Sequence, residues 1–361
     1  MKVGIVGGGQ LARMLVLAGY PLGLQFRVLD PAADACAGQV TELIRGHYDD
    51  AVHLAALAAW ADVVTFDFEN VPAAAARMLT QQTAVYPPEE ALAIAQDRLA
   101  EKTLFWELGI PAPTFSTVDS LEELHDAVMR VGLPAVLKTR RLGYDGKGQR
   151  VLQTVADLEP AWRALGAAPL ILEDFVAFER EVSVLAARSR NGETAFYPLV
   201  ENQHRDGILR LSQAPFYAPE LEQEGIDYAR RLLARLNYVG LLAIEFFVKD
   251  GHLIANEMAP RVHNSGHWTI EGAATSQFEN HLRAILGLPL GSTAAIGYSA
   301  MLNGIGDLLE PAAVLAMPGA HYHAYGKARR PGRKVGHVTL WASDPLSLRA
   351  GLERLKALTA D

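Results

Sequence analysis

The first residues combine an apolar run, a glycine-rich turn and a helical spacing, and this combination limits the fold more than any other feature. The apolar run Val3–Val6 ends in three consecutive glycines at 7–9, and apolar side chains at 11–18 then recur with the period of a helix. Two more runs typical of strands follow at 26–30 and 63–66. Strand, helix and strand in this order predict a parallel sheet covered by helices.

The turn itself matches the pattern G-x-G-x-x-A over residues 7–12, and Asp30 ends the next expected strand. Bare amides at a helix N-terminus favour an anion, usually a phosphate. An acidic residue about 20 positions further on binds ribose hydroxyls in dinucleotide enzymes. The first interpretation is therefore a dehydrogenase. The alternative is a tight turn without a ligand.

The rest of the chain changes character twice. A helical pattern is expected over 91–108, and the prolines and glycine of 109–113 indicate a link between domains. A helix is expected at 121–131 and another near 228–236. Closely spaced strands predict an antiparallel sheet, at 170–173, 181–187, 196–200, 241–248 and 253–258. A third segment, from about residue 295, has short strands and a basic stretch at 327–334.

Composition narrows the class of protein. Half of the 361 residues are hydrophobic, which suits two or three domains with real cores. The formal net charge of −8 does not favour nucleic acid or anionic membranes as partners. The lone cysteine, Cys36, excludes an intrachain disulfide and is expected to be a buried, inert thiol. The N-terminal residues lack the pattern of a signal peptide, and the sequence contains no apolar run of transmembrane length, so a cytoplasmic protein is expected.

A strand lysine and a glycine-rich hairpin point to nucleotide binding. Lys138 ends the apolar run 135–137, and the segment 140–149 contains three glycines among cationic residues. Such a hairpin can fold over phosphates, although it is not a Walker A loop because no G-K-[ST] ends it. The alternative is a solvated basic hairpin.

Two carboxylates give the most specific prediction of a metal site in the sequence. Glu245 and Glu257 lie in apolar strands almost equidistant from a turn at 249–251, so they are expected to be cross-strand neighbours. Two such acids need a cation between them, and with Asn256 they favour Mg²⁺ on a nucleotide's phosphates. The alternative is an acid pair facing solvent. The polar loop that follows, 259–268, lacks cysteine, and its residues do not favour zinc.

Four motifs together resemble the ATP-grasp family, and within it the ATP-dependent carboxylases of purine biosynthesis: GGGQL at 7–11, GYDGKGQ at 143–149, NEMAPRVHNSGH at 256–267 and RPGRKVGH at 330–337. The resemblance implies an α/β and α+β architecture: an N-terminal Rossmann-like (pre-ATP-grasp) domain, an ATP-grasp fold and a small C-terminal β-rich domain. Their expected bounds are 1–95, 96–292 (small lobe about 112–175) and 293–361.

The implied activity is that of a carbon–nitrogen ligase. It uses ATP and bicarbonate, through carboxyphosphate, to convert 5-aminoimidazole ribonucleotide into 5-(carboxyamino)imidazole ribonucleotide, ADP and phosphate. Mg²⁺ and a homodimer are also implied. The first glycine-rich loop then holds substrate phosphate or shapes that pocket, and NAD is not expected. A sister ligase such as the formate-dependent glycinamide ribonucleotide transformylase, a dehydrogenase and a non-catalytic nucleotide-binding regulator are the alternatives.

The resemblance also implies roles for individual residues. The metal ligands would be Glu245 and Glu257. The ATP site would contain Arg98, Lys138, Gly143, Tyr144, Asp145, Gly146, Lys147, Gly148, Gln149, Glu173, Asp174, Phe175, Val176, Glu181, His204, Asn256 and Glu257. The ribonucleotide would be bound by Gln10, Leu11, Glu69, Asn264, Lys327, Arg333 and Lys334. The catalytic residues would be Tyr144, Asp145, Lys147, Arg261 and His263. One departure is Asp67, which stands where relatives usually carry Glu.

Overall fold

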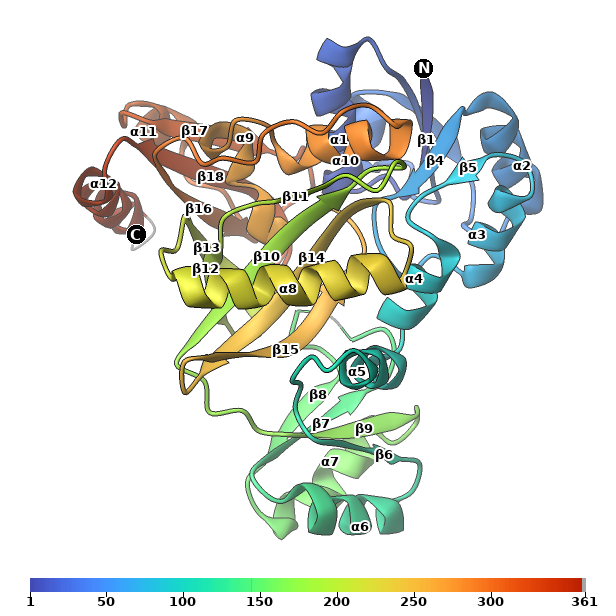
Figure 1. Cartoon of the computed structure of the whole chain (residues 1–361), viewed down its shortest axis with the longest axis vertical. Helices are drawn as coiled ribbons and strands as arrows, with labels where there is room; N and C mark the ends of the chain where they lie inside the picture. Colours follow the sequence, from blue (N-terminus) through green and yellow to red (C-terminus); the bar gives the residue numbers. More distant parts are fainter. Residues whose placement is uncertain (144, 359–361) are drawn as a thin grey trace.

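The computed structural model describes residues 1–143 and 145–358, which form three sheets with helices packed on them (Figure 1). The N-terminal sheet is entirely parallel, in the order β3-β2-β1-β4-β5. Its strands are β1 (Lys2–Val6), β2 (Gln25–Asp30), β3 (Glu42–Arg45), β4 (Val63–Phe66) and β5 (Ala84–Val85). The helices of this region are α1 (Gln10–Gly19), α2 (Ala51–Trp60), α3 (Ala73–Thr80) and α4 (Glu89–Ala95). The predicted parallel sheet is confirmed.

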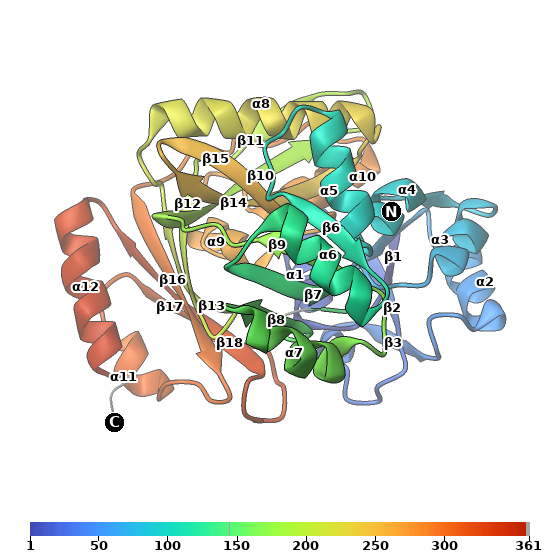
Figure 2. The ribbon, with the colours of Figure 1, turned by 90° about the horizontal axis from the view of Figure 1, so that it is seen from below.

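A small lobe projects from the rest of the molecule. Its antiparallel sheet has the order β6-β9-β7-β8, made of β6 (Phe115–Val118), β7 (Ala135–Thr139), β8 (Gln149–Leu152) and β9 (Leu170–Asp174). Two helices, α6 (Leu121–Val131) and α7 (Leu158–Leu165), cover the outer face of this sheet (Figure 2). The other face is therefore left to turn toward the large sheet.

The large sheet runs β15-β14-β10-β12-β13-β16-β18-β17, with β11 paired to β10. Its strands are β10 (Arg180–Arg188), β11 (Thr194–Phe196), β12 (Val200–Arg205), β13 (Ile208–Ala214), β14 (Gly240–Lys249), β15 (His252–Ala259), β16 (Tyr298–Ile305), β17 (Ala320–Ala324) and β18 (Lys334–Ala342). The remaining helices are α5 (Arg98–Glu107), α8 (Pro219–Arg235), α9 (Thr269–Gly272), α10 (Gln277–Leu286), α11 (Pro311–Leu315) and α12 (Pro345–Ala357). The C-terminal strands do not form a separate sheet, because β16 pairs directly with β13.

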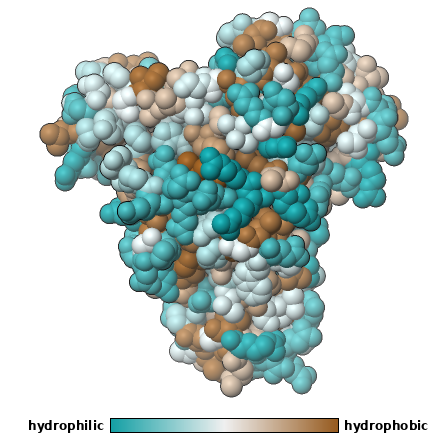
Figure 3. All heavy atoms as spheres, viewed as in Figure 1, coloured by the Kyte–Doolittle hydropathy of each residue, from teal (hydrophilic) through white to brown (hydrophobic). Residues whose placement is uncertain are grey.

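Opposite faces of β10 and β14 pack against different helices. α8 covers one face, and its outward side chains make the middle of the view in Figure 3 hydrophilic. α10 covers the other face and contacts α1, so that the N-terminal sheet and the large sheet share one hydrophobic core. Within the described part of the chain, every helix is too short or too polar to span a membrane.

Two segments differ from the predicted pattern. The expected helix over 91–108 is two helices, because Asp97 adopts an extended conformation and its side chain accepts a hydrogen bond from the Leu99 N–H at 3.1 Å, capping α5. The expected strand over 196–200 is interrupted by Pro198, which has no N–H to donate. The β12–β13 hairpin was not predicted, although its turn carries the Asp206-Gly207 pair typical of hairpins.

His281 connects the two sheets through a buried imidazole. Its Nδ1 accepts the Leu241 N–H at 3.1 Å, so its Nε2 carries the proton and donates to Thr65 Oγ1 at 2.9 Å. Burial lowers the pKa of His281 to about 4. The folded protein therefore holds this ring neutral, whereas the unfolded chain protonates it below its usual pKa of about 6.5.

This difference predicts an acid-sensitive contribution to stability. The free energy of unfolding includes the full contribution of His281 above pH 6.5. As the pH drops from 6.5 towards 4, this free energy falls by about 3 kcal/mol, because only the unfolded chain takes up the proton. Urea unfolding at several pH values should show a flatter pH dependence for His281→Asn than for the unchanged protein. His125→Asn, at an exposed position of α6, is the control. An unchanged pH dependence in His281→Asn would contradict this assignment.

Candidate active site

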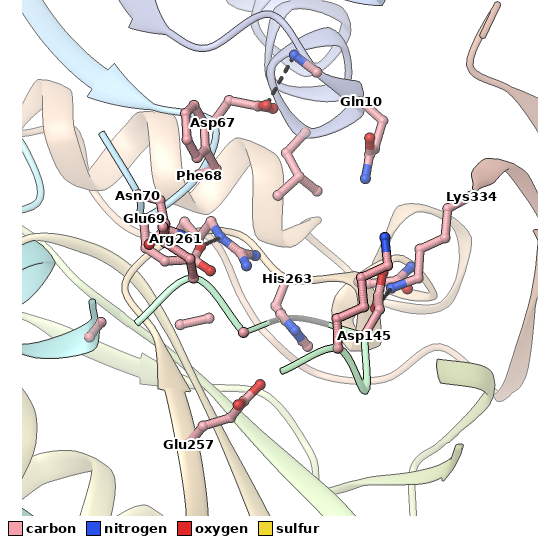
Figure 4. A pocket seen from close by; sticks show the side chains of 18 of the residues that line it. Gln10, Asp67, Phe68, Glu69, Asn70, Asp145, Glu257, Arg261, His263 and Lys334 are labelled. Atoms are coloured by element: carbon pink, nitrogen blue, oxygen red, sulfur yellow. Dashed lines mark hydrogen bonds and ion pairs between the residues drawn. The ribbon is translucent and has the colours of Figure 1, made fainter. Parts of the chain in front are cut away.

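Two cavities lie side by side where the three regions meet. The large cavity, of about 870 Å³, lies between the N-terminal sheet, the end of β15 and the basic segment 327–334. The small cavity, of about 370 Å³, lies between the small lobe and strands β14 and β15. They share a wall formed by Arg98, Asp145, Lys147, Glu257, His263, Asn264 and Lys334. In Figure 4, His263 lies between Gln10 and Asp67 on one side and Glu257 on the other.

The expected site residues divide between these cavities. The small cavity is lined by Arg98, Lys138, Asp145, Gly146, Lys147, Gln149, Glu173, Asp174, Phe175, Val176, Glu181, His204, Glu245, Asn256 and Glu257. The large cavity is lined by Gln10, Leu11, Glu69, Arg98, Gly143, Asp145, Lys147, Glu257, Arg261, His263, Asn264, Lys327, Arg333 and Lys334. Gly148 lines neither of the two; its carbonyl accepts the Thr139 N–H at 2.8 Å. Tyr144 lies outside the described residues.

The N-terminal glycine turn is occupied by the protein's own carboxylates. Asp30 accepts the Gly8 N–H at 2.8 Å, and Asp67 accepts the N–H groups of Gly9 and Ala12 at 3.0 and 2.6 Å. The expectation of bare amides for a phosphate is therefore wrong at these three positions. Asp67 supplies the anion that a helix N-terminus favours, and the turn shapes the wall of the large cavity.

The basic segment closes the large cavity from the C-terminal side. Lys327 donates a hydrogen bond to Gln10 Oε1, and Lys334 Nζ lies 2.9 Å from Asp145 Oδ1 in the β7–β8 hairpin. Burial lowers the pKa of Lys327, although the charge of Asp67 opposes this. Arg333 and Arg330 also line the cavity, and the sequence analysis did not single out Arg330. Cationic side chains from one segment thus converge on one end of the cavity.

The β7–β8 hairpin touches a second hairpin at its tip. Asp145 and Gly146 have positive φ values of 46° and 75°. A Cβ added to Gly146 would lie 2.8 Å from the Asp206 carbonyl oxygen, in the turn between β12 and β13. Only glycine permits this approach. The hairpin is therefore held over the junction of the cavities by this contact and by Lys334.

The paired carboxylates lie as expected in the β14–β15 hairpin. Glu245 is directly opposite Glu257, and the register then shifts so that Phe246 is opposite Ala255. The extra residue of this β-bulge is Asn256. Residues in regular strands alternate between faces, so the bulge lets both Asn256 and Glu257 line the small cavity. The interpretation as a solvent-facing acid pair is not supported, because Glu245 is largely buried.

Charges around Glu245 are incompletely balanced. Burial raises the pKa of Glu245 to about 7; His204 opposes this shift, whereas Glu257 adds to it. His204 Nδ1 lies 2.9 Å from Glu181 Oε2. Arg98 Nη1 lies 3.4 Å from Glu257 Oε2. Within residues 1–143 and 145–358, no group of three or more His, Cys, Asp and Glu side chains is arranged to hold a metal ion.

His263 is neutral and has a defined tautomer. Burial and the nearby charges of Arg261 and Lys334 hold its pKa well below the usual range. The Ser265 N–H points to its Nδ1, so Nε2 carries the proton and lies 3.6 Å from Glu245 Oε1. Arg261 forms an ion pair with Glu69. Burial alone would raise the pKa of Glu69, but Arg261 outweighs it and the pKa is lowered.

A second charged cluster lies at the wall of the small cavity. Glu173 Oε2 lies 2.7 Å from Lys138 Nζ and 3.6 Å from Lys102 Nζ. Burial opposes ionisation of Glu173, but the charges of Lys102, Lys138 and Arg98 outweigh it and lower its pKa to about 2. This carboxylate is therefore ionised and serves to compensate buried cations.

Sequence analysis missed several residues of this region. Asp97 pairs with both Arg140 and Arg141, at 2.7 and 3.3 Å. Glu101 and Lys102 are 2% and 0% exposed, although charged residues in a helix usually face solvent. Burial raises the pKa of Glu101 to about 8. The spacing of Arg98, Glu101 and Lys102, which places them on one helical face, was the available signal.

Three family models match successive parts of the chain. The ribonucleotide synthetase preATP-grasp domain matches residues 1–96, the ATP-grasp domain matches 103–278, and the phosphoribosylaminoimidazole carboxylase C-terminal domain matches 299–350. The order of these matches follows the order of the regions described above.

Individual relatives match over nearly the whole chain. The N5-carboxyaminoimidazole ribonucleotide synthase of Pseudomonas aeruginosa is 58% identical over 358 residues, which are 99% of each protein. The crystal structure of the synthetase from Thermus thermophilus is 57% identical and has a TM-score of 0.96, with 99% of each chain covered. The structure of the Aspergillus clavatus synthase in complex with ADP and 5-aminoimidazole ribonucleotide is 31% identical, has a TM-score of 0.90 and covers 99% of this chain and 97% of its own.

Sequence identity of this extent, together with the fold and the two joined cavities, shows that the chain belongs to the ATP-grasp family of N5-carboxyaminoimidazole ribonucleotide synthases.

Proposed function

We propose that this chain carboxylates 5-aminoimidazole ribonucleotide with ATP and bicarbonate, giving 5-(carboxyamino)imidazole ribonucleotide, ADP and phosphate in purine biosynthesis. The observation that carries the proposal is the wall shared by the two cavities. An activated acid formed on the nucleotide side reaches the amine on the ribonucleotide side without crossing bulk water. A relative's structure with ADP and 5-aminoimidazole ribonucleotide supports the same pair of ligands.

The small cavity is the proposed ATP site. Backbone groups at 173–176, where β9 ends, would bind adenine, and Glu181 would bind the ribose hydroxyls. Lys138 and Arg98 would neutralise the phosphates. The hairpin residues 143–149, with His204 and Asn256, would enclose the triphosphate. The burial of Lys138 and its contact with Glu173 support this assignment, because they fix the direction of the ammonium group.

Mg²⁺ fits the carboxylates of β14 and β15. Protein sites for Mg²⁺ commonly provide one or two carboxylates and leave the other positions to phosphates and water. Glu245 and Glu257 provide such a pair, and burial of Glu245 beside other acids favours a cation there. When bound, Mg²⁺ would supply charge neutralisation to the phosphates.

The large cavity is the proposed ribonucleotide site. Lys327, Arg333 and Lys334 would bind the 5′-phosphate, because cationic side chains from one segment gather at its end. The remaining contacts would come from uncharged and acidic residues that also line this cavity: Gln10, Leu11, Glu69 and Asn264.

The proposed chemistry needs no covalent enzyme intermediate. A bicarbonate oxygen attacks the γ-phosphorus, the bond to ADP breaks, and carboxyphosphate forms. The exocyclic amine then attacks the carboxyl carbon of carboxyphosphate, or attacks CO₂ that carboxyphosphate has released. In either route phosphate leaves and the amine loses a proton. Arg261 and the Nε2–H of His263 would orient the carboxyphosphate, with Asp145 and Lys147 acting from the β7–β8 hairpin. Tyr144 would be a further catalytic residue. Closure would exclude water, which hydrolyses carboxyphosphate.

Further parts of the proposal concern organisation. We infer a division at 1–95, 96–292 and 293–361, supported by the change from parallel to antiparallel pairing after β5. We also infer a homodimer acting in the cytoplasm. The homodimer rests on the family resemblance, and the cytoplasm rests on a sequence with a single cysteine and no signal-peptide pattern.

The function is tested by ADP release from MgATP and bicarbonate, with and without 5-aminoimidazole ribonucleotide. We expect strong stimulation by the ribonucleotide. ADP release only with formate and glycinamide ribonucleotide would instead identify the sister ligase. Fluorescence titration with reduced nicotinamide cofactor should show no binding, since Asp30 and Asp67 occupy the glycine turn.

Glu257→Gln should reduce turnover by about a hundredfold or more, since several kcal/mol of charge stabilisation at the phosphates is lost. The urea midpoint should stay close to that of the unchanged protein. Glu220→Gln, on the exposed side of α8, is the matched control. Near-normal turnover by Glu257→Gln would show that the metal assignment is wrong.

Lys334→Ala should raise the KM for the ribonucleotide about tenfold or more, because a charged hydrogen bond contributes about 1.5–3 kcal/mol. The KM for ATP should change much less, even though Lys334 borders both cavities. Lys356→Ala, in the exposed part of α12, controls for loss of a surface charge. Equal increases in both KM values would contradict a role in phosphate binding.

A further inference from the structure

The edge of the large sheet at β15 is closed by a helix instead of another strand. β15 pairs with β14 on one side only. On its other side the Ala255 N–H donates to the Pro111 carbonyl at 2.7 Å, and the Met258 N–H donates to Glu101 Oε1 at 2.7 Å. An open edge exposes backbone groups that need partners. Here these partners come from α5 and the segment after it.

Lys102 is the centre of this closure. Its Nζ donates to the carbonyl oxygens of Ala255, at 3.4 Å, and Asn256, and lies 3.6 Å from Glu173 Oε2. Two of the three N–H donors of the ammonium group thus serve backbone carbonyl oxygens, and its charge forms an ion pair with Glu173. The side chain is 0% exposed, so water does not compete for them.

These contacts coincide with the β-bulge. Asn256 is the extra residue of the bulge, and Ala255 precedes it. Glu101 accepts a hydrogen bond from the Met258 N–H, one residue beyond Glu257. α5 therefore contacts β15 on both sides of Asn256 and Glu257, the two bulge residues that line the small cavity. Because the ladder is interrupted at a bulge, its geometry depends on contacts from outside the sheet.

We propose that Lys102 is a positioning residue for nucleotide binding: it holds the β15 bulge so that Asn256 and Glu257 face the same cavity, and it joins that bulge to Glu173 of the small lobe. Lys102 is not among the residues that line either cavity, so it is placed to act through the residues that do. The proposal rests on the proposed function in that the small cavity binds a nucleotide and that Glu257 helps to hold its Mg²⁺.

The direct test is calorimetric titration of Lys102→Met with ADP, with and without Mg²⁺. Methionine has a similar length but leaves two buried carbonyl oxygens without a donor. We expect the affinity for MgADP to fall about 10- to 100-fold, as for other partners that orient a metal site. The preference for MgADP over metal-free ADP should also shrink. Partial unfolding would change the number of binding sites but not this preference.

Lys249→Met, at the turn of the same β14–β15 hairpin, is the matched control and should bind MgADP like the unchanged protein. If Lys102→Met does not fold, Glu101→Leu removes a different contact of α5 with β15, the one to the Met258 N–H, and its MgADP affinity should also fall. A folded Lys102→Met or Glu101→Leu with unchanged affinity and metal preference would overturn the proposal. An unchanged protein that binds MgADP but does not carboxylate the ribonucleotide would contradict the proposed function and not the role of Lys102.

Discussion

Compensation of buried charge at the boundary between the small lobe and the large sheet is the constraint on which the rest of the site depends. Glu173 is nearly inaccessible to water, and it is ionised because Lys138 and Lys102 lie within 3.6 Å of it. These charges come from β9, β7 and α5, so the balance exists only when the lobes are placed together. The small cavity is built around this balanced set, whereas the charges of Glu245 and Glu257 in its wall are less completely balanced.

The contrast between these two groups of carboxylates assigns them different tasks. Glu173 is already paired with two lysines, so a further cation would stabilise its charge only slightly. Glu245 is buried and its pKa is raised to about 7, so a nearby cation would stabilise its ionised form. The β-bulge strengthens the contrast, since it brings Asn256 and Glu257 to the same cavity. The outer side of this edge strand, β15, is hydrogen-bonded to side chains of α5.

The preference of a helix N-terminus for negative charge can be met by a bound anion or by the protein's own carboxylate, and the turn before α1 shows the second case. A helix N-terminus attracts negative charge, and the pattern of residues 7–12 expresses this preference. In this fold Asp67, from the loop after β4, supplies the charge, and a shorter side chain than glutamate is sufficient to reach Gly9 and Ala12. Four of the cations that line the cavity come from the distant segment 327–334.

The sequence by itself determined the elements whose periodicity is local. The parallel N-terminal sheet and the helix 121–131 could be predicted because the spacing of apolar residues indicates strands and helices. The facing of Glu245 and Glu257 could be predicted because both lie at nearly the same distance from one turn. Tertiary structure alone decided which buried charges meet. The spacing of Glu101 and Lys102 places them on one helical face with Arg98, but nothing in their own segment indicates which distant groups they contact. Their partners lie far away in the chain, and such pairs are set by packing between lobes, which local sequence does not encode.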